Sequence, residues 1–149
     1  MTKRIICLIL IVIWLSVIFV FSSGTGNSSN SLSKRLINKS IMVYEKLSGN
    51  DVNNEVIIKK LNYPIRKVAH FTIFLVLGIF IYLFINTFDI SHKMLISILL
   101  SLSFAILDET HQLFVYERTS KIIDIFIDTL GSITSCSIFN IINYKKHNN

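Results

Sequence analysis

The stretch Val68–Phe88, VAHFTIFLVLGIFIYLFINTF, decides the fold of this chain. Its twenty-one residues include no Asp, Glu, Lys or Arg and a single His. About 20 consecutive apolar residues are enough for an α-helix to cross the hydrocarbon core of a bilayer. The stretch therefore predicts a transmembrane helix, and the rest of the chain is interpreted around it.

Three further apolar segments accompany this one in the sequence. Ile5–Phe21 precedes it, and another begins at Met94 and continues through Asp108-Glu109 towards Phe114. The last runs from about Ile122 to Asn143 and is interrupted by two Asp residues. The segments predict an all-α, integral membrane bundle of four transmembrane helices in one domain, 1–149, with spans at about 5–21, 66–88, 94–114 and 122–143.

The composition agrees with a membrane protein and argues against a soluble domain. Hydrophobic residues make up 52% of the 149 residues and charged residues 16%, whereas about 25% of an ordinary soluble domain is charged. The net charge of +6 favours anionic lipid headgroups as partners, and the chain carries no nucleic-acid-binding motif. Cys7 and Cys136 lie in apolar segments without a CxxC pattern, so no disulfide framework is expected.

The first apolar segment has two interpretations. Lys3 and Arg4 before Ile5–Phe21, and the small residues after it, resemble a cleaved signal peptide. The run is slightly long for the apolar region of such a peptide, and no A-x-A cleavage site follows. We therefore expect a retained membrane anchor.

The connection at 22–65 carries a second kind of helix. Residues 22–33 are rich in Ser, Gly and Asn and predict a loop, and Leu32–Leu47 combines apolar residues at helical spacing with basic ones. Such a helix either lies on the membrane surface or is solvated and packed on the loop. Pro64 suits the first turn of the second span, and Asp89–Lys93 predicts the turn between the second and third.

The count of crossings places both termini on one side of the membrane. It also brings the start of the second span, the end of the third and the start of the fourth to one face, which we call the polar face. Ten of the fifteen basic residues lie on that side, which by charge count would make it cytoplasmic. The Lys3-Arg4 start indicates the opposite orientation, and we expect both termini in the cytoplasm.

Ten ionisable or amide side chains gather at the polar face and form a candidate pocket. They are Arg66, Lys67, His70, Asp108, Glu109, His111, Gln112, Arg118, Asp124 and Asp128. Asp124 and Asp128 are four residues apart on one side of a helix, where Gly131 and Ser135 continue the stripe and predict close helix packing. An ionised carboxylate at the depth of Asp128 is unfavourable unless paired or hydrated, so the residues form either a functional pocket or paired contacts between helices.

Two ligands fit these residue types. Arg66, Lys67 and Arg118 could grip a phosphate group, as in a lipid headgroup, although lysines near a helix end also snorkel to headgroups. His70, Asp108, Glu109 and His111 are candidate ligands for a divalent metal. Because D-E-x-H is not the H-E-x-x-H order of zinc sites, the sequence alone assigns no metal or other cofactor.

The same residues make the chain resemble the VanZ-like family of small bacterial membrane proteins. Arg66–Phe71 (RKVAHF) resembles the family's R-K-x-A-H-F, and Asp108–Phe114 (DETHQLF) resembles its D-E-x-H-Q-x-F. The segment Trp14–Ser23 with Ser28-Ser29 resembles the first helix and the F-S-S-Q after it, and the family's R…D…D-x-x-G is matched by Arg118, Asp124, Asp128 and Gly131. Gly24 replaces the usual Gln, and Tyr116-Glu117 replaces a Pro-Gly beside the pocket.

The resemblance implies a bacterial cell-envelope membrane protein, with a link to teicoplanin resistance. The leading hypothesis is a pocket that binds an anionic envelope lipid or a lipid-linked cell-wall precursor. Arg66 and Arg118 would meet phosphate, His70, Asp108, Glu109 and His111 would form the floor, and Asp124 and Asp128 would orient Arg66, Arg118 or His70. The alternatives are a membrane-embedded hydrolase or transferase, with or without a metal, and a structural or interaction protein whose polar residues serve only helix packing.

Overall fold

The computed structural model describes residues 1–49, 54–118 and 120–148, and over these ranges it is helical with no strand. The elements are α1 (Thr2–Ser23), α2 (Gly26–Ser48), α3 (Asn54–Ile85), α4 (Lys93–Gln112) and α5 (Ile122–Asn148). Four of them, all except α2, are long and apolar enough to cross a membrane. The predicted all-α class with four membrane-spanning helices is confirmed.

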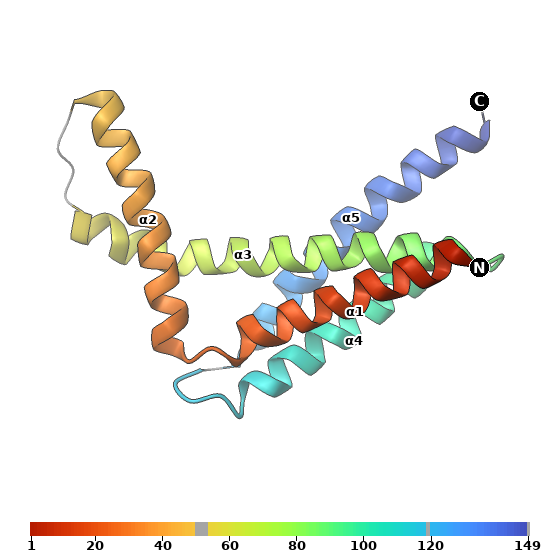
Figure 1. Cartoon of the computed structure of the whole chain (residues 1–149), viewed down its shortest axis with the longest axis horizontal. Coiled ribbons are helices and arrows are strands. Elements are labelled where there is room, and N and C mark those ends of the chain that lie inside the picture. The colour runs from red at the N-terminus through yellow and green to blue at the C-terminus, as the bar shows by residue number, and fades with distance from the viewer. Residues whose placement is uncertain (50–53, 119, 149) are drawn as a thin grey trace.

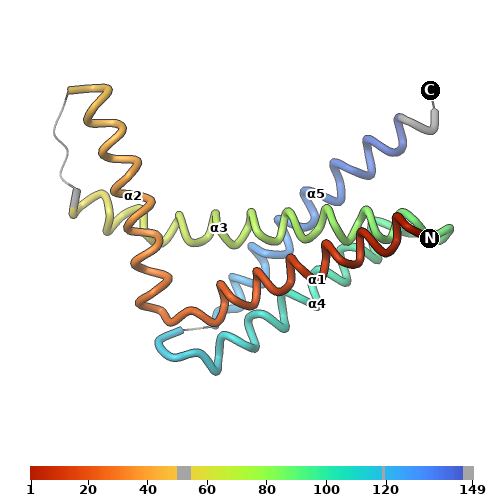
Figure 2. The backbone as a smooth tube through the Cα atoms, in the orientation of Figure 1, coloured from red at the N-terminus to blue at the C-terminus, as the bar shows by residue number. Residues whose placement is uncertain are grey.

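The four candidate membrane-spanning helices, α1, α3, α4 and α5, are called the long helices below. They alternate in direction around a central α3 (Figure 1). The N- and C-terminal ends both lie at one end of the bundle, and the turns from α1 to α2 and from α4 to α5 lie at the other. The tube of Figure 2 shows α2 leaving that second end and crossing the first half of α3 at a steep angle. The start of α3, the end of α4 and the start of α5 therefore share one end, as the count of crossings predicts.

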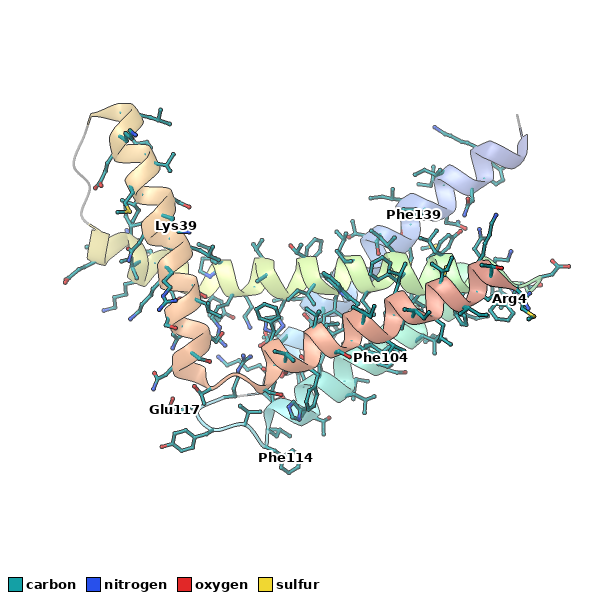
Figure 3. The ribbon with its side chains drawn as sticks, viewed as in Figure 1. Arg4, Lys39, Phe104, Phe114, Glu117 and Phe139 are labelled. Carbon is teal, nitrogen blue, oxygen red and sulfur yellow. The ribbon has the colours of Figure 1, made fainter. Side chains whose placement is uncertain are left out.

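The core follows the inward side of α3. Phe74, Leu77 and Ile81 are at most 1% exposed, and Ile11 and Ile18 of α1 join them. Most other apolar side chains of the long helices project outward (Figure 3), such as Val12 at 55% and Phe126 at 61% exposed. An apolar surface of this extent suits contact with lipid chains rather than water.

Small residues bring α3 and α5 into close contact, as predicted for the stripe that continues from Asp128. A Cβ on Gly131 would lie 2.3 Å from the carbonyl oxygen of Phe71, and one on Gly78 would lie 2.4 Å from Ser135 Oγ. Ser132 Oγ donates a hydrogen bond of 3.0 Å to the carbonyl oxygen of Phe74. The backbones of the two helices therefore touch with little side chain between them, a common packing mode in membranes.

The prediction of a loop at 22–33 is wrong, because α1 extends to Ser23 and α2 begins at Gly26. Thr25 caps α2, its hydroxyl accepting a hydrogen bond from the backbone N–H of Ser28. Ser31 and Ser33 within the helix donate to carbonyl oxygens three and four residues earlier. Such hydroxyl bonds slightly weaken a helix, so the Thr25 cap and the packing of α2 on α3 account for the helix here. The amphipathic pattern starting at Leu32 therefore lies inside a longer helix.

The second long apolar helix begins earlier than the sequence indicates, since α3 begins at Asn54 and Pro64 lies inside it rather than in its first turn. An internal proline removes one hydrogen bond of the helix, a cost that tertiary packing has to offset. Leu61 and Ile65, on either side of Pro64, line one groove together with Ile37 and Ile41 of α2. Packing against α2 thus holds these turns in the helix.

The remaining boundaries differ from the predicted spans by a few residues. The turn between α3 and α4 comprises residues 86–92 instead of Asp89–Lys93, α4 ends at Gln112 short of Phe114, and α5 continues to Asn148 beyond Asn143. Apolar patterns locate helices well but their ends poorly, because polar residues continue a helix past the apolar stretch.

Candidate functional site

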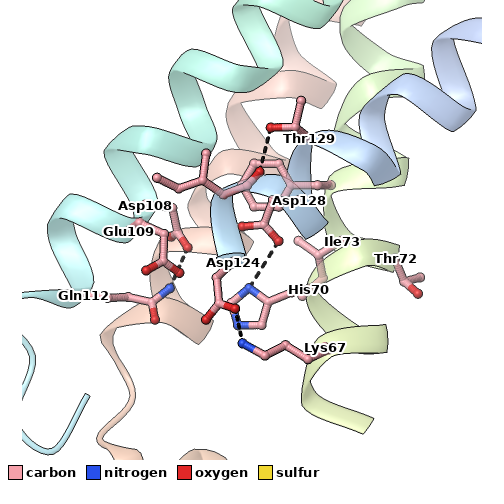
Figure 4. A network of polar contacts seen from close by, with 12 residues as sticks. Lys67, His70, Thr72, Ile73, Asp108, Glu109, Gln112, Asp124, Asp128 and Thr129 are labelled. Atoms are coloured by element: carbon pink, nitrogen blue, oxygen red, sulfur yellow. Dashed lines mark hydrogen bonds and ion pairs between the residues drawn. The ribbon is translucent and has the colours of Figure 1, made fainter. Parts of the chain in front are cut away.

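The candidate pocket lies where the start of α3, the end of α4 and the start of α5 meet (Figure 4). Of the predicted residues, Asp108, Glu109, Gln112, Asp124 and Asp128 are buried. Burial makes the partners of these side chains decisive, because an unpaired charge away from water is strongly unfavourable. The partners divide nine of the ten predicted residues into three groups, and Arg66 is described with the cavity below.

The first group ties helices together. Lys67 of α3 forms an ion pair with Asp124 of α5, and the Lys67 ammonium also lies 4.9 Å from the centre of the Tyr63 ring. Glu109 Oε2 accepts a hydrogen bond of 3.0 Å from the backbone N–H of Lys121, just before α5. A carboxylate there stabilises the helix start, where N–H groups lack partners inside the helix. The roles of Lys67, Glu109 and Asp124 in the structure are thus contacts between elements.

Arg118 also has protein partners, on two other elements. Its guanidinium donates to the carbonyl oxygens of Phe21 and Gly24, at 2.8 and 2.9 Å, and to Gln112 Oε1 at 3.1 Å. Gln112 in turn donates a hydrogen bond of 2.8 Å to Asp108 Oδ2. Burial, and then the neighbouring Arg66, lower the pKa of the Arg118 guanidinium, which still keeps its charge because arginine starts from so high a value.

His111 belongs to a second group that faces away from the pocket. Its Nε2 lies 3.1 Å from Ser23 Oγ, and its ring stacks on Phe19 at 4.6 Å. His111 therefore packs against the end of α1. Glu109 and His111, which the sequence analysis expected in the floor of the pocket, do not line the cavity described below.

The third group, His70, Asp108 and Asp128, converges in the interior. One ligand atom from each residue lies within 4.8 Å of the other two, and we call these three residues the buried cluster. His70 Nδ1 is 3.5 Å from Asp128 Oδ1, and the Asp128 side chain is completely buried. The expectation that Asp128 orients His70 agrees with this distance, whereas Asp124 contacts Lys67 instead of an arginine.

A cavity of about 420 Å³ opens beside the buried cluster, between α1, α2 and α3. Apolar side chains form most of its wall, among them Trp14, Ile18, Phe21, Leu36, Ile73 and Phe74. Arg66, His70, Asp108 and Arg118 line it as well. Arg66 donates one hydrogen bond of 3.4 Å, to Asn30 Oδ1, within the part of the chain that the structure describes. The cavity thus combines an apolar wall with a cationic group that has few protein partners.

Sequence reasoning missed the residues that α1 and α2 contribute. Trp14 forms part of the cavity wall while its indole N–H donates to the carbonyl oxygen of Ile73. Ser22 lines the cavity too, and its buried hydroxyl has no hydrogen-bond partner among the described residues. The Trp14–Ser23 motif was a usable signal for both. Nothing in the sequence indicated Asn30, because its role depends on α2 folding back over α3.

Comparisons with known proteins give one result. The family model described as VanZ/LLP1 matches residues 7–143 of the chain. No curated protein and no solved structure shows significant similarity to it. The match covers all four long helices in large part, and it includes the ten residues of the candidate pocket.

Proposed function

This chain belongs to the VanZ/LLP1 family, and from that premise we propose that its cavity binds an anionic membrane amphiphile. The amphiphile is an envelope lipid or a lipid-linked cell-wall precursor. Its phosphate lies at Arg66, and its hydrocarbon chain lies along the apolar wall made by α1, α2 and α3. The protein acts in the cell membrane of a bacterium, where its four long helices suit a multi-pass arrangement.

The observation that carries this proposal is the composition of the cavity. Most ligand sites are largely apolar with a few polar groups that fix orientation, and here Arg66, Ser22 and His70 are such groups. Arginine is well suited to phosphate because its planar fork donates two parallel hydrogen bonds. Within the described residues, Arg66 donates one hydrogen bond, of 3.4 Å to Asn30. Binding a phosphate would therefore require the loss of that bond alone.

The position of the cavity along the bundle also suits a lipid headgroup. At ~1.5 Å per residue, the 32 residues of α3 extend ~48 Å, more than the ~30 Å of a hydrocarbon core. Its first turns therefore lie in the headgroup region if its apolar half spans the core. Arg66, twelve residues after the start of α3, is then close to the level of lipid phosphates.

Several polar residues fit helix packing instead of ligand binding. Lys67, Glu109, Asp124 and His111 are all engaged between elements, as described above. The packing hypothesis accounts for these four but gives no role to the cavity or to Arg66. We therefore keep lipid binding as the function and packing as the role of those four side chains.

For orientation, we infer that the polar face is extracytoplasmic and both termini are cytoplasmic. The Lys3-Arg4 start supports this orientation, as does a role at the cell surface. A lipid-linked precursor bound there would have altered accessibility to glycopeptide antibiotics, which is the proposed link to teicoplanin resistance.

The test is lipid binding by an Arg66→Ala variant. The purified chain in detergent is titrated with phosphatidylglycerol and, separately, with a polyprenyl diphosphate, and a variant Arg35→Ala serves as the matched control because Arg35 is exposed on α2. A charge-assisted hydrogen bond contributes about 1.5–3 kcal/mol, so we expect Arg66→Ala to weaken binding roughly 10- to 100-fold. Arg35→Ala should bind as the unmodified chain does.

The same variants test the resistance link in a teicoplanin-susceptible Gram-positive host, with membrane levels compared by blot. We expect the unmodified chain and Arg35→Ala to reduce susceptibility, and Arg66→Ala at equal abundance to leave it unchanged. Equal lipid affinity of all three proteins would contradict the binding proposal. Unchanged susceptibility with a well-expressed unmodified chain would contradict the resistance link alone.

A further inference from the structure

The buried cluster brings together three potential metal ligands from three helices. His70 comes from α3, Asp108 from α4 and Asp128 from α5, and Figure 4 shows their side chains pointing into the same space between the helices. One nitrogen and two carboxylate oxygens lie within 4.8 Å of one another. Ligands placed tetrahedrally at ~2.0–2.2 Å from a zinc ion lie ~3.3–3.6 Å apart. His70 Nδ1 and Asp128 Oδ1 are separated by 3.5 Å, which is such a distance.

The carboxylate of Asp128 is the second, independent observation. Its side chain is completely buried, and neither of its oxygens has a hydrogen-bond partner among the described residues. His70 lies at 3.5 Å, beyond the length of a strong hydrogen bond. A buried carboxylate normally has partners for its lone pairs, so the structure leaves Asp128 aimed into the cluster without them.

The neighbouring cations are engaged elsewhere. Lys67 pairs with Asp124, and Arg118 donates to Phe21, Gly24 and Gln112. Arg66, which lines the same cavity as His70 and Asp108, donates to Asn30 and forms no ion pair with either acid of the cluster among the described residues. Asp108 accepts one hydrogen bond, from the uncharged amide of Gln112. Two buried acidic groups therefore lie close to each other and to His70, and neither is paired with a lysine or arginine among the described residues. A bound cation would supply the missing positive charge.

We propose that His70, Asp108 and Asp128 bind one divalent transition-metal cation, zinc or manganese. Imidazole favours zinc and other late transition metals, whereas carboxylates favour manganese and the harder cations. One imidazole and two carboxylates suit a cation between these extremes. The amide of Gln112 holds Asp108 in place, which is the kind of supporting contact that metal ligands usually have.

The site would be open on one side. His70 and Asp108 line the cavity, whereas Asp128 lies behind them and does not. Three protein ligands leave at least one position free on zinc, as in sites that bind water or a substrate oxygen. That position would face the cavity, where it would take water or an oxygen of a phosphate. The cation site itself does not depend on the lipid proposal, because none of its ligands comes from the lipid.

This ligand set differs from the one that the sequence suggests. Glu109 Oε2 accepts a hydrogen bond from the backbone of Lys121, while its Oε1 is buried without a partner among the described residues. His111 packs on Phe19 and Ser23. Neither residue belongs to the group whose ligand atoms lie within 4.8 Å of one another. Asp128, absent from the sequence-based set, takes their place. His111 and Glu109 therefore provide matched controls of the same residue types as the ligands and from the same end of the bundle.

The experiment is a titration of the detergent-solubilised full chain with ZnCl₂ and, separately, with MnCl₂, followed by calorimetry. The protein carries an affinity tag without histidines and is first dialysed against a chelator. We expect one equivalent of at least one of the two cations per chain. We also expect His70→Gln and Asp128→Asn to weaken its binding at least tenfold, while His111→Gln and Glu109→Gln bind as the unmodified chain does.

Circular dichroism checks that each variant is folded, and Asp108→Asn replaces Asp128→Asn if the latter does not fold. Arg66→Ala serves as a second control, because it should lose lipid affinity but keep the cation. The proposal is overturned if the folded, unmodified chain binds neither cation at a stoichiometric site. It is equally overturned if the His70 and Asp128 variants, or their Asp108 replacement, bind as tightly as the unmodified chain.

Discussion

At the residue scale, Arg118 illustrates how one side chain can fasten two helices. The sequence predicts that Arg118 binds a phosphate group. In the structure, its guanidinium instead donates to the carbonyl oxygens of Phe21 and Gly24 and to Gln112. The last carbonyl groups of an α-helix lack partners within the helix and carry its negative end. Arg118 satisfies them at the end of α1 and links α1 to the end of α4.

We predict that Arg118→Ala loses stability, because three hydrogen bonds to a charged group disappear together. The expected loss is about 3 kcal/mol, given about 1.5–3 kcal/mol for each such bond and incomplete additivity. Arg118→Lys should recover only part of it, because a lysine lacks the planar fork. Denaturant unfolding in detergent measures the change. A variant as stable as the unmodified chain but with lost phosphate binding would show that Arg118 acts on the ligand instead.

Glu117, the residue before Arg118, has an unusual backbone conformation. Glu117 has φ of +59°, a left-handed conformation that favours glycine. The resemblance described in the sequence analysis has Pro-Gly where this chain has Tyr116-Glu117. Glu117 therefore adopts with a side chain a backbone conformation that glycine adopts more readily. Figure 3 shows Glu117 in the connection between α4 and α5, below the start of α2.

At the element scale, the contact of α3 with α5 positions the buried cluster. His70 lies on α3 and Asp128 on α5, and the close approach at Gly131 follows one turn beyond Asp128. Ser132 Oγ donates to the carbonyl oxygen of Phe74 at the same level. The separation of the two helices therefore controls the distance from the imidazole to the carboxylate.

We predict that Gly131→Ala destabilises this contact, because the added Cβ would lie 2.3 Å from the carbonyl oxygen of Phe71. The backbones have to move apart, and overpacking of this kind costs about 1–3 kcal/mol. Thermal unfolding in detergent measures the loss, with Thr134→Ala as the control on the exposed side of α5. Equal unfolding temperatures for both variants and the unmodified chain would contradict the close packing.

At the scale of the whole molecule, the two ends of the bundle differ in chemistry. Arg4 donates to the carbonyl oxygen of Thr87 and lies over the Phe88 ring at the end that holds the termini. The buried cluster, the cavity and α2 lie at the other end. A membrane protein with such polarity has a defined orientation, and the proposed function requires the second end to face outward.

We predict that a cysteine placed at Tyr116 reacts with a membrane-impermeant thiol reagent in intact cells, and that one at Ser91 reacts only after permeabilisation. Both positions are exposed, and they lie in turns at opposite ends of the bundle. Cys7 and Cys136 are replaced by serine in both proteins so that each carries one thiol. The reverse labelling pattern would place the cavity in the cytoplasm and contradict the proposed orientation.

The sequence by itself determined that this is an all-α membrane protein with four candidate membrane-spanning helices and with its polar residues gathered at one end. Both results follow from quantities that can be counted along the sequence, namely the length of each apolar run and the number of membrane crossings. Helix ends could not be located in this way at Pro64 or at residues 22–33, because the packing of α2 on α3 and the Thr25 cap of α2 decided them.

Only the tertiary structure decided which polar residues are neighbours. Spacing along a helix gives the direction of a side chain but not the rotation of one helix against the next. That rotation brings Asp128 to His70 and Asp108, while Glu109 meets the start of α5 and His111 meets α1. The cavity likewise exists because α2 folds back over α3 and leaves a space between these two helices and α1, an arrangement that no local pattern in the chain contains.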